Sequence, residues 1–358
     1  VMGGSLWILI ANALAYRIFY SRKFVGLVFW VLLPIGISFL IKPILNETDN
    51  VNVVVVQPNI DPYGEKFGGL TADEQLEKLL TLASEKVDKT TDYLIGPETA
   101  LIGGLWENNL GQSSLIKRLQ NYLQEYPQLK IIVGASTYKR FKENEELSAT
   151  IRYDTLANIY YDAYNTALQL DTTGVQLYHK SKLVPGVEMI PFAPILKHFK
   201  WLSINLGGVV GSLGSQSKRT VFRSEQGQVA PIICYESIYG EYVLDYVRAG
   251  ADLLTIITND GWWKDTPGYR QHLAYASLRA IETRRSIARS ANTGTSAFVD
   301  VLGNIFQPTS WWQPAVIQQE LPLHQGITFY TIYGNYIGRL AAFVSAILFF
   351  YVIAKRKQ

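Results

Sequence analysis

The sequence contains a single cysteine, Cys234, and only four histidines among its 358 residues. One cysteine excludes an intrachain disulfide, and the histidines show no paired spacing of the kind that metal ligands require. We therefore expect neither a metal nor another cofactor. The charges nearly balance, with 33 lysines and arginines against 30 aspartates and glutamates. The resulting net charge of +3 is too even to suggest a nucleic-acid partner.

Charged residues are also scarce, at 18 % of the chain, whereas a typical soluble domain has about 25 %. The apolar excess is concentrated at the two ends of the chain. Residues 5–20 and 24–41 are apolar runs of roughly membrane-spanning length, and a short basic turn with Arg22 and Lys23 separates them. Within residues 1–42 we therefore expect two transmembrane helices that form a hairpin.

A third apolar run, residues 332–354, stops at a basic tail, residues 355–357. If both basic clusters are cytoplasmic, the positive-inside rule places the segment between about Lys42 and Tyr330 on the opposite side of the membrane. A pair of buried core helices or a cleaved signal peptide explains the positions of the basic clusters less well. Because the chain opens on Val1 rather than on methionine, we expect further spans upstream in a longer protein.

Between these ends, residues 50–326 alternate short β-branched runs with amphipathic stretches, a layout typical of an α/β domain. Residues 51–56 are apolar on both faces and predict a strand that is covered on both sides. Thr71 and Glu74 form a capping box that opens a helix. A β-hairpin is predicted farther along the chain, with its turn at residues 171–174.

The second half of this domain shows the same alternation. Residues 229–236, 253–260 and 296–304 predict strands, and a long helix is expected through residues 269–290. The glycine-rich segment 207–219 lacks the Gly-Lys-Ser/Thr end of a phosphate-binding loop, so we interpret it as a flexible loop.

Three polar residues stand just beyond predicted strands, which is where α/β sheets bind their ligands. Glu98 follows YLIGP, Lys180 follows VQLYH and Cys234 follows APII. Together they can carry out acyl transfer, because the carboxylate takes the thiol proton, the thiolate attacks a carbonyl and the ammonium stabilises the oxyanion. Each residue also has a structural interpretation: Glu98 as a helix cap, Lys180 as a solvated strand end and Cys234 as a small core residue.

Four motifs, GPET, YHKSKLVPGVE, IICYES and TNDGWW, occur in the order and spacing of the carbon–nitrogen hydrolase (nitrilase) superfamily. With its apolar ends, the chain resembles the membrane-bound branch of that superfamily, the apolipoprotein N-acyltransferases. The resemblance covers roughly residues 51–325 and the apolar segments on either side. It implies an αββα sandwich flanked by transmembrane helices, in a bacterial inner membrane, with the catalytic domain in the periplasm.

The resemblance also implies the roles of individual residues. Glu98 would be the general base, Lys180 the oxyanion partner and Cys234 the nucleophile. Glu188 in VPGVE matches a family glutamate near this triad, although the family often reads VPFGE at that place.

Four further residues are implied to support the reaction or to bind substrate. Tyr235 and Glu236 match the two residues that follow the nucleophile in the family. Phe67 stands where the branch often has a tryptophan, which leaves its contact with lipid open. Trp262, after the TND motif, is either an aromatic at the substrate entrance or a packing residue.

In the branch that the chain resembles, the acyl donor is a membrane phospholipid and the acceptor is the α-amino group of a diacylated apolipoprotein. The chain would transfer the acyl group through a thioester on Cys234. Two alternatives stay open from the sequence. A membrane-tethered amidase or nitrilase would use the same three residues with water as acceptor, and a non-enzymatic scaffold would keep the fold for partner binding.

Overall fold

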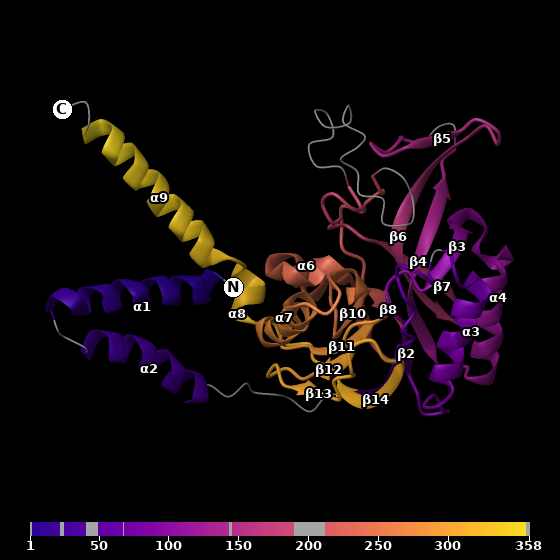
Figure 1. The fold of residues 1–358 in the computed structure, drawn as a ribbon, viewed down its shortest axis with the longest axis horizontal. Helices are drawn as coiled ribbons and strands as arrows, with labels where there is room; N and C mark the ends of the chain where they lie inside the picture. Colours follow the sequence, from indigo (N-terminus) through magenta and orange to yellow (C-terminus); the bar gives the residue numbers. More distant parts are fainter. Residues whose placement is uncertain are drawn as a thin grey trace. The chain divides into compact units, whose positions relative to one another are not determined.

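The computed structural model describes residues 2–21, 25–40, 49–66, 68–142, 145–189 and 212–355 (Figure 1). The chain divides into two compact units. The first combines Val1–Glu47 with Ile332–Gln358, and the second is Thr48–Thr331. Part of the predicted loop 207–219 and the basic residues Arg22 and Lys23 lie outside the described residues.

The first unit contains three apolar helices: α1 (Met2–Ser21), α2 (Val25–Leu40) and α9 (Tyr336–Lys355). The indole N–H of Trp7 donates to the carbonyl of Trp30 at 3.0 Å, and that of Trp30 donates to the carbonyl of Trp7 at 3.3 Å. These reciprocal bonds join α1 and α2 in the hairpin that the sequence predicts.

Among the described helices, α9 alone is long and apolar enough to cross a membrane, with a mean hydropathy of 2.1 and no buried residue. The apolar stretches of α1 and α2, Gly4–Ile18 and Val25–Leu40, are shorter. One of the three predicted spans is therefore supported by length and composition, and the two N-terminal spans stay a prediction.

The second unit contains two β-sheets and the helices that cover them. Its strands are β1 (Asn50–Gln57), β2 (Tyr93–Ile95), β3 (Leu101–Trp106), β4 (Lys130–Arg140), β5 (Arg152–Asp154), β6 (Ile159–Asp171), β7 (Gly174–His179), β8 (Phe222–Arg223), β9 (Gln228–Ile233), β10 (Leu253–Thr258), β11 (Ser286–Ala291), β12 (Ala297–Val299), β13 (Ile305–Phe306) and β14 (Ala315–Pro322). Its α-helices are α3 (Ala72–Ala83), α4 (Ser114–Glu125), α6 (Gly240–Arg248) and α7 (Pro267–Thr283), and α8 (Phe329–Tyr333) follows at its end. Short 3₁₀ helices are η1 (Glu107–Gln112), η3 (Cys234–Ile238) and η4 (Asp260–Trp263).

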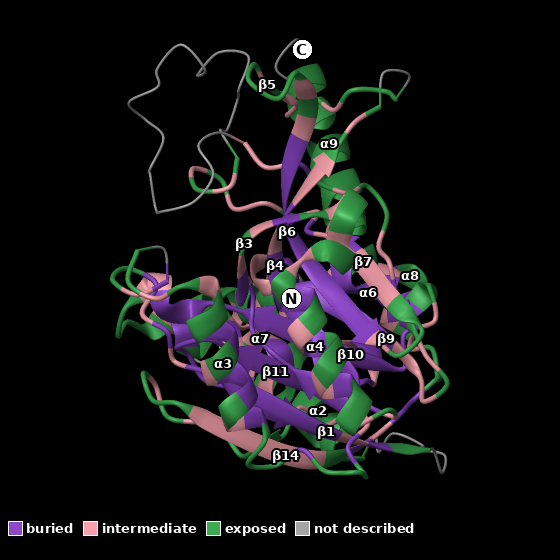
Figure 2. Cartoon of the chain, turned by 90° about the vertical axis from the view of Figure 1, so that its right-hand side faces the viewer, coloured by how far each residue is buried: buried purple, intermediate pink, exposed green. Residues whose placement is uncertain are grey.

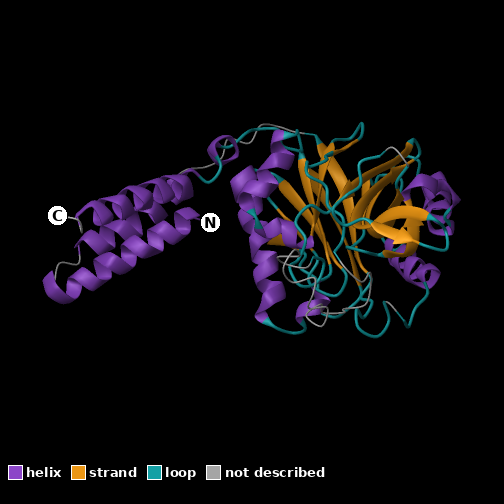
Figure 3. Ribbon diagram, turned by 90° about the horizontal axis from the view of Figure 1, so that it is seen from above, coloured by secondary structure: helices purple, strands orange, loops and turns teal. Residues whose placement is uncertain are grey.

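The described strands form an eight-stranded and a six-stranded sheet. The larger sheet runs in the order β14-β1-β2-β4-β6-β5, with β3 beside β4 and β7 beside β6. The smaller sheet runs β13-β12-β11-β10-β9-β8, and its central strands β9, β10 and β11 are parallel. In Figure 3 the strands of this unit lie between helices on either side, which is the predicted αββα arrangement.

Two apolar cores hold these layers together, and strand β1 contributes to both. Val53 and Val55 belong to a core that also contains Ile232 and Ile256 of the smaller sheet. Val54 and Val56 belong to a second core with leucines of α3 and α4. The prediction that this strand is covered on both faces is confirmed, and most strands are buried (purple) in Figure 2.

Two local predictions are confirmed by hydrogen bonds. The Thr71 hydroxyl accepts from the backbone N–H of Glu74, and the Glu74 carboxylate accepts from the N–H of Thr71, which is the predicted capping box of α3. Strands β6 and β7 form the predicted antiparallel hairpin, in which Asp171 pairs with Gly174.

The long helix predicted through residues 269–290 is wrong at its C-terminal end. Helix α7 ends at Thr283, Arg284 takes a left-handed conformation with φ of 54°, and residues 286–291 form strand β11. The arginine-rich end of this segment has a sequence typical of a helix. In the structure, however, Ile287 and Ala288 pack in the core between the sheets. Tertiary packing therefore overrides local helix propensity at this point.

Candidate active site

The three polar residues predicted at strand ends lie at three strand ends in the structure. Glu98 comes shortly after β2, while Lys180 directly follows β7 and Cys234 directly follows β9. Strands β2 and β7 belong to the larger sheet, whereas β9 belongs to the smaller one. The three residues therefore come from both sheets, and the packing of the two sheets decides whether they meet.

Glu98 and Lys180 form a buried ion pair. Nζ of Lys180 lies 2.9 Å from Oε1 of Glu98, and the two residues are 1 % and 5 % exposed. The other carboxylate oxygen, Oε2, accepts from the backbone N–H of Asn259 at 3.1 Å. Burial would raise the pKa of Glu98, but the charge and hydrogen bond of Lys180 outweigh it and lower that pKa. Glu98 is thus a carboxylate at neutral pH, the form that can accept a proton.

Glu188 and Asn165 complete the surroundings of this pair. Oε1 of Glu188 lies 2.9 Å from Nζ of Lys180. The side-chain amide of Asn165 donates to Glu98 at 2.8 Å and to Glu188 at 2.9 Å. The two carboxylates are thus bridged by one ammonium and one amide, which places Glu188 beside Lys180.

Lys180 keeps its charge in this buried site. Burial would lower the pKa of Lys180, yet the charges of Glu188, Glu98 and Cys234 hold it well above its ordinary value. The backbone N–H of Lys180 donates to the carbonyl of Asn165 at 2.8 Å, which continues the β6–β7 ladder by one residue. The ammonium is therefore a fixed, permanently charged donor, as stabilisation of an oxyanion requires.

Cys234 occupies a strained position at the start of η3. Its φ is 48°, in the left-handed region that non-glycine residues rarely adopt. Burial, followed by the charge of Glu98, raises the pKa of the Cys234 thiol, while Lys180 opposes the rise. Glu98 and Lys180 thus shift the pKa of the Cys234 thiol in opposite directions. Because the resting thiol is protonated, its attack on a carbonyl needs a base that removes the proton.

Glu236 anchors the turn that carries the cysteine. Its side chain is fully buried and accepts from the hydroxyls of Tyr178 and Tyr242, both at 2.7 Å. It also accepts from the backbone N–H groups of Ile233 at 2.9 Å and Ser181 at 2.7 Å. These bonds tie the residue before Cys234 to the residue after Lys180. Glu236 thus holds the backbone next to Cys234 in a fixed position relative to the backbone next to Lys180.

A second buried network of hydrogen bonds reaches the backbone carbonyl of the cysteine. Nε2 of His272 is 3.1 Å from the carbonyl oxygen of Cys234, and Nδ1 of the same ring is 3.0 Å from Asp260. Arg289 donates to Asp260 at 2.5 Å. Burial would raise the pKa of Asp260, but Arg289 and His272 hold it at about 2. The network thus contacts the backbone of the turn that contains Cys234.

A model of the carbon–nitrogen hydrolase family matches residues 52–329. The chain belongs to this family. An apolipoprotein N-acyltransferase from Chlorobaculum tepidum is 32 % identical over 382 residues, which cover 100 % of this chain and 69 % of the relative. The resemblance to the N-acyltransferase branch is confirmed.

Two further relatives carry the same name. The apolipoprotein N-acyltransferase of Shewanella oneidensis is 26 % identical and matches 98 % of this chain, and that of Sinorhizobium fredii is 40 % identical over 72 % of it. The chain covers 64 % and 45 % of these two relatives. The chain of this carbon–nitrogen hydrolase thus spans only part of the length of the curated relatives.

Solved structures share the fold of this carbon–nitrogen hydrolase. An amidase from Nesterenkonia sp. is 14 % identical with a TM-score of 0.51, and covers 79 % of this chain and 94 % of its own. A CN-hydrolase superfamily protein from Xanthomonas campestris is 15 % identical with a TM-score of 0.51, over 76 % and 91 % of the two chains. At these identities the likeness shows the fold alone.

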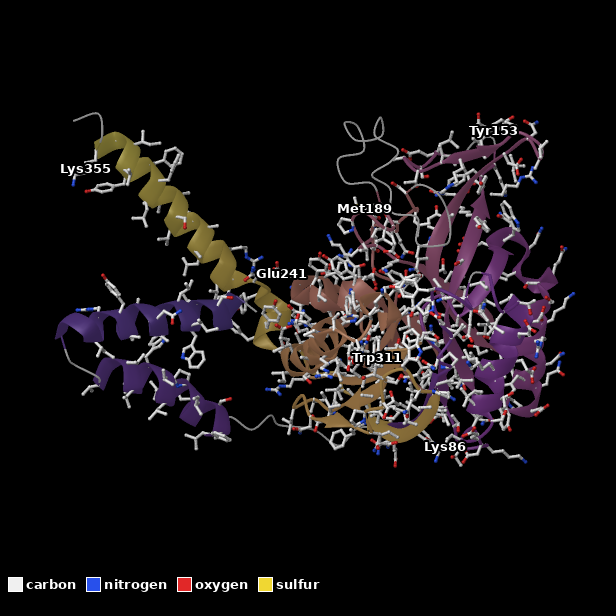
Figure 4. The ribbon with its side chains drawn as sticks, in the orientation of Figure 1. Lys86, Tyr153, Met189, Glu241, Trp311 and Lys355 are labelled. Carbon is white, nitrogen blue, oxygen red and sulfur yellow. The ribbon has the colours of Figure 1, made fainter. Side chains whose placement is uncertain are left out.

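The predicted aromatic residues lie in different surroundings. Trp262 is half-buried in η4, where its ring meets that of Tyr63 edge-on at 5.4 Å. Tyr235 is half-buried and contacts Tyr239 at 5.2 Å between ring centroids. Phe67 lies outside the described residues. Trp311, labelled in Figure 4, stacks on Tyr269 at 4.3 Å and is thus engaged in packing.

Two polar residues at the site escaped prediction. Asn165 lies in the buried part of β6, and an amide in a buried strand is the signal that could have identified it. Lys66, in the segment between β1 and α3, donates to the carbonyl of Glu98 at 3.2 Å and has no motif around it. Among the described residues, no three His, Cys, Asp or Glu side chains gather as a metal site would require.

Proposed function

We propose that this chain transfers an acyl group from a membrane phospholipid to the α-amino group of a diacylated apolipoprotein. The observation that carries the proposal is the buried Glu98–Lys180 pair, whose charges act on the single cysteine. The names of the relatives support an amine of an apolipoprotein as the acyl acceptor. The reaction would take place in residues 50–326, which contain all three groups.

The first half-reaction would form a thioester. The carboxylate of Glu98 takes the proton of the Cys234 thiol, and the thiolate attacks the ester carbonyl of the phospholipid. Lys180 donates a hydrogen bond to the oxyanion that develops. When the tetrahedral intermediate collapses, the bond to the glycerol oxygen breaks and Glu98 returns its proton to that oxygen. Lysophospholipid leaves and the acyl group stays on the sulfur.

The second half-reaction would transfer the acyl group to the amine. The neutral α-amino group of the acceptor attacks the thioester carbonyl, and Glu98 takes one of its protons. Lys180 again stabilises the oxyanion. Collapse of this intermediate breaks the bond to sulfur, the proton on Glu98 returns to Cys234, and an amide is released.

The apolar helices support a membrane setting for this chemistry. Drawing a sixteen-carbon chain into water would cost roughly 12 kcal/mol at about 0.8 kcal/mol per methylene. A domain held at the bilayer surface avoids that cost, because the acyl chain stays in apolar surroundings while the ester reaches the thiol. We propose that α9 and the helices α1 and α2 span the bacterial inner membrane, with the central domain in the periplasm.

The deciding experiment reconstitutes the full-length protein in phospholipid vesicles and adds a synthetic diacylated lipopeptide. Mass spectrometry should show lipopeptide that is heavier by one acyl chain, together with lysophospholipid in equal amount. Matched vesicles with Cys234→Ala should show neither product. Free fatty acid without acylated lipopeptide would contradict the proposal and would instead indicate a hydrolase that uses water as acceptor.

A further inference from the structure

Lys66 is a second buried lysine at the same glutamate. It is 2 % exposed, although it lies in the irregular segment between β1 and α3. Its ammonium donates to the backbone carbonyl of Glu98 at 3.2 Å and to the hydroxyl of Thr99 at 2.5 Å. Lys180 binds the carboxylate of Glu98 and Lys66 binds its backbone, so two ammonium groups approach one residue from different sides.

The Glu98–Thr99 turn that Lys66 contacts is strained and closely packed. Thr99 has a φ of 47°, a conformation that is costly for a residue with a branched side chain. On its other side the turn touches β4, where a Cβ at Gly134 would lie 2.4 Å from the backbone nitrogen of Thr99. The turn is therefore held between the backbone of Gly134 and the ammonium of Lys66.

The backbone of Lys66 is itself fixed. The side-chain amide of Gln75, on α3, donates to the carbonyl of Lys66 at 2.8 Å. The N–H of Lys66 donates to the carbonyl of Asp61 at 2.9 Å. The backbone of Lys66 is thus held at both of its polar groups, and its ammonium is held separately by its bonds to Glu98 and Thr99.

The charge of Lys66 balances the site. Two carboxyl groups, those of Glu98 and Glu188, face the single ammonium of Lys180, and Lys66 adds a second ammonium. Of the residues that line the space beside Lys66, which include Ile60, Leu79, Pro97 and Asn292, Glu98 alone carries a charge of opposite sign. On its own segment, Glu65 is engaged with the backbone N–H of Asp61.

We propose that Lys66 is a positioning residue for Glu98, which holds the Glu98–Thr99 turn in place and supplies a second positive charge to the site in which Glu98 takes the proton of the thiol. The proposal rests on the proposed triad. Burial lowers the pKa of Lys66 to about 8, and the charges of Glu98 and Cys234 oppose that change. Its contribution is therefore present below about pH 8 and is lost as the pH rises through that value.

The test measures the first half-reaction alone. Full-length protein in phospholipid vesicles, without an acceptor, is sampled over time from about pH 6 to about pH 9.5, and the acylated fraction is measured by intact mass. Lys66→Met should slow acylation about tenfold or more near neutral pH and should move the acid limb upward, because Glu98 loses a favourable charge. Lys66→Arg should keep most of the rate and should extend it above the alkaline limit of the wild type, since a guanidinium stays charged.

Lys78→Met is the matched control. Lys78 is a half-buried lysine on α3 whose ammonium donates to the carbonyl of Asn59 at 3.0 Å, so its loss should leave the pH profile of acylation unchanged. A Lys66→Met profile identical to the wild type would overturn the proposal. So would a uniform fall at every pH that Lys66→Arg fails to restore, because such a fall indicates a structural role without a charge effect.

Two further arms keep the result interpretable. If Lys66→Met does not fold, as judged by circular dichroism and melting, the alkaline limb of Lys66→Arg decides alone, and a limb that coincides with the wild type refutes the proposal. A p-nitrophenyl ester serves as a second acyl donor. If only this ester acylates Cys234, the proposed phospholipid donor fails, while the comparison of Lys66 variants is carried out with the ester.

Discussion

The surroundings of Glu98 and of Glu236 differ in one decisive respect. Both carboxylates are buried in the same domain, and burial by itself raises the pKa of each. Around Glu98 the ammonium of Lys180 reverses that effect, so the pKa falls. Around Glu236 only neutral hydroxyl and N–H groups donate; they offset burial in part, and the pKa rises.

The comparison teaches that charge and hydrogen bonding prepare a carboxylate for different tasks. Glu98 has a positive partner at 2.9 Å and stays ionised, so it can take a proton from the neighbouring thiol. Glu236 has several neutral donors from separate segments, which make it an anchor rather than a base. Four predictions test this division between a base and an anchor.

The largest effect should come from replacing Cys234, whose thiol both carboxylates are proposed to support. Cys234→Ala should abolish transfer, and Cys234→Ser should do nearly the same, since a hydroxyl in the same surroundings is far harder to deprotonate than a thiol, whose ordinary pKa is about 8.5. Incubated with phospholipid and no acceptor, the wild type should gain one acyl group that hydroxylamine removes, as measured by intact mass. An adduct that persists in Cys234→Ala would show that the acyl group is attached elsewhere.

The next effect should come from the base itself. Glu98→Gln and Lys180→Met should each lower the rate of acylation about 10²-fold to 10⁴-fold, because they remove proton abstraction and oxyanion stabilisation. Unchanged circular dichroism serves as the control for folding. A near-normal acylation rate in folded Glu98→Gln would show that Glu98 is not the base. The same result for folded Lys180→Met would show that Lys180 is not the oxyanion partner.

A smaller effect, on stability, should follow from changing the anchor. Glu236→Gln turns one acceptor oxygen into a donor that faces Ile233 or Ser181, so the protein should lose about 1–3 kcal/mol of stability. Tyr178→Phe, which removes a single donor at 2.7 Å, should cost about 1 kcal/mol. Melting followed by tryptophan fluorescence would measure both, and equal melting temperatures in wild type and Glu236→Gln would refute the anchor.

The smallest effect should be the opposite pH dependence of the two carboxylates. Since the pKa of Glu98 is lowered by folding, its contribution to stability is present above the ordinary glutamate value of about 4.3 and is lost as the pH falls below it. Since the pKa of Glu236 is raised, stability should rise as the pH falls through that raised value toward about 4.3.

The difference in melting temperature between wild type and variant, measured from neutral to acid pH, isolates each contribution. As the pH falls toward about 4.3, the melting temperature of the wild type should rise relative to that of Glu236→Gln. Below that value it should fall relative to that of Glu98→Gln. The same slope for both variants would mean that the two environments do not differ as described.

Local patterns in the sequence predicted much of this fold. The valines of β1, the capping box at Thr71 and the turn at Asp171 each depend on residues close together in the chain, so their signals are readable without tertiary structure. The end of α7 was not predictable in this way. There the core selected a strand for a segment whose arginines favour a helix.

The predicted strand-end residues located the candidate site, but not its inner contacts. Glu98 and Lys180 are 82 residues apart and meet because β4 pairs with β2 and β3 and also with β6, and β6 pairs with β7. Asn165 and Lys66 belong to no motif, since one is an amide within a buried strand of mixed composition and the other lies in an irregular segment. Their importance depends on which side chains the folded chain brings to them.

The pairing of β1 with β14 also constrains the order in which the domain can fold during synthesis. Asn50 faces Pro322 across this ladder, and its side chain bonds Glu320, which follows 270 residues later. During synthesis one edge of β1 therefore stays unpaired until nearly the whole domain has left the ribosome. Until then this edge is exposed to pairing with another chain. The last strand of the domain and the last apolar helix are produced almost together, so completion of the sheet and emergence of that helix become consecutive events in biogenesis.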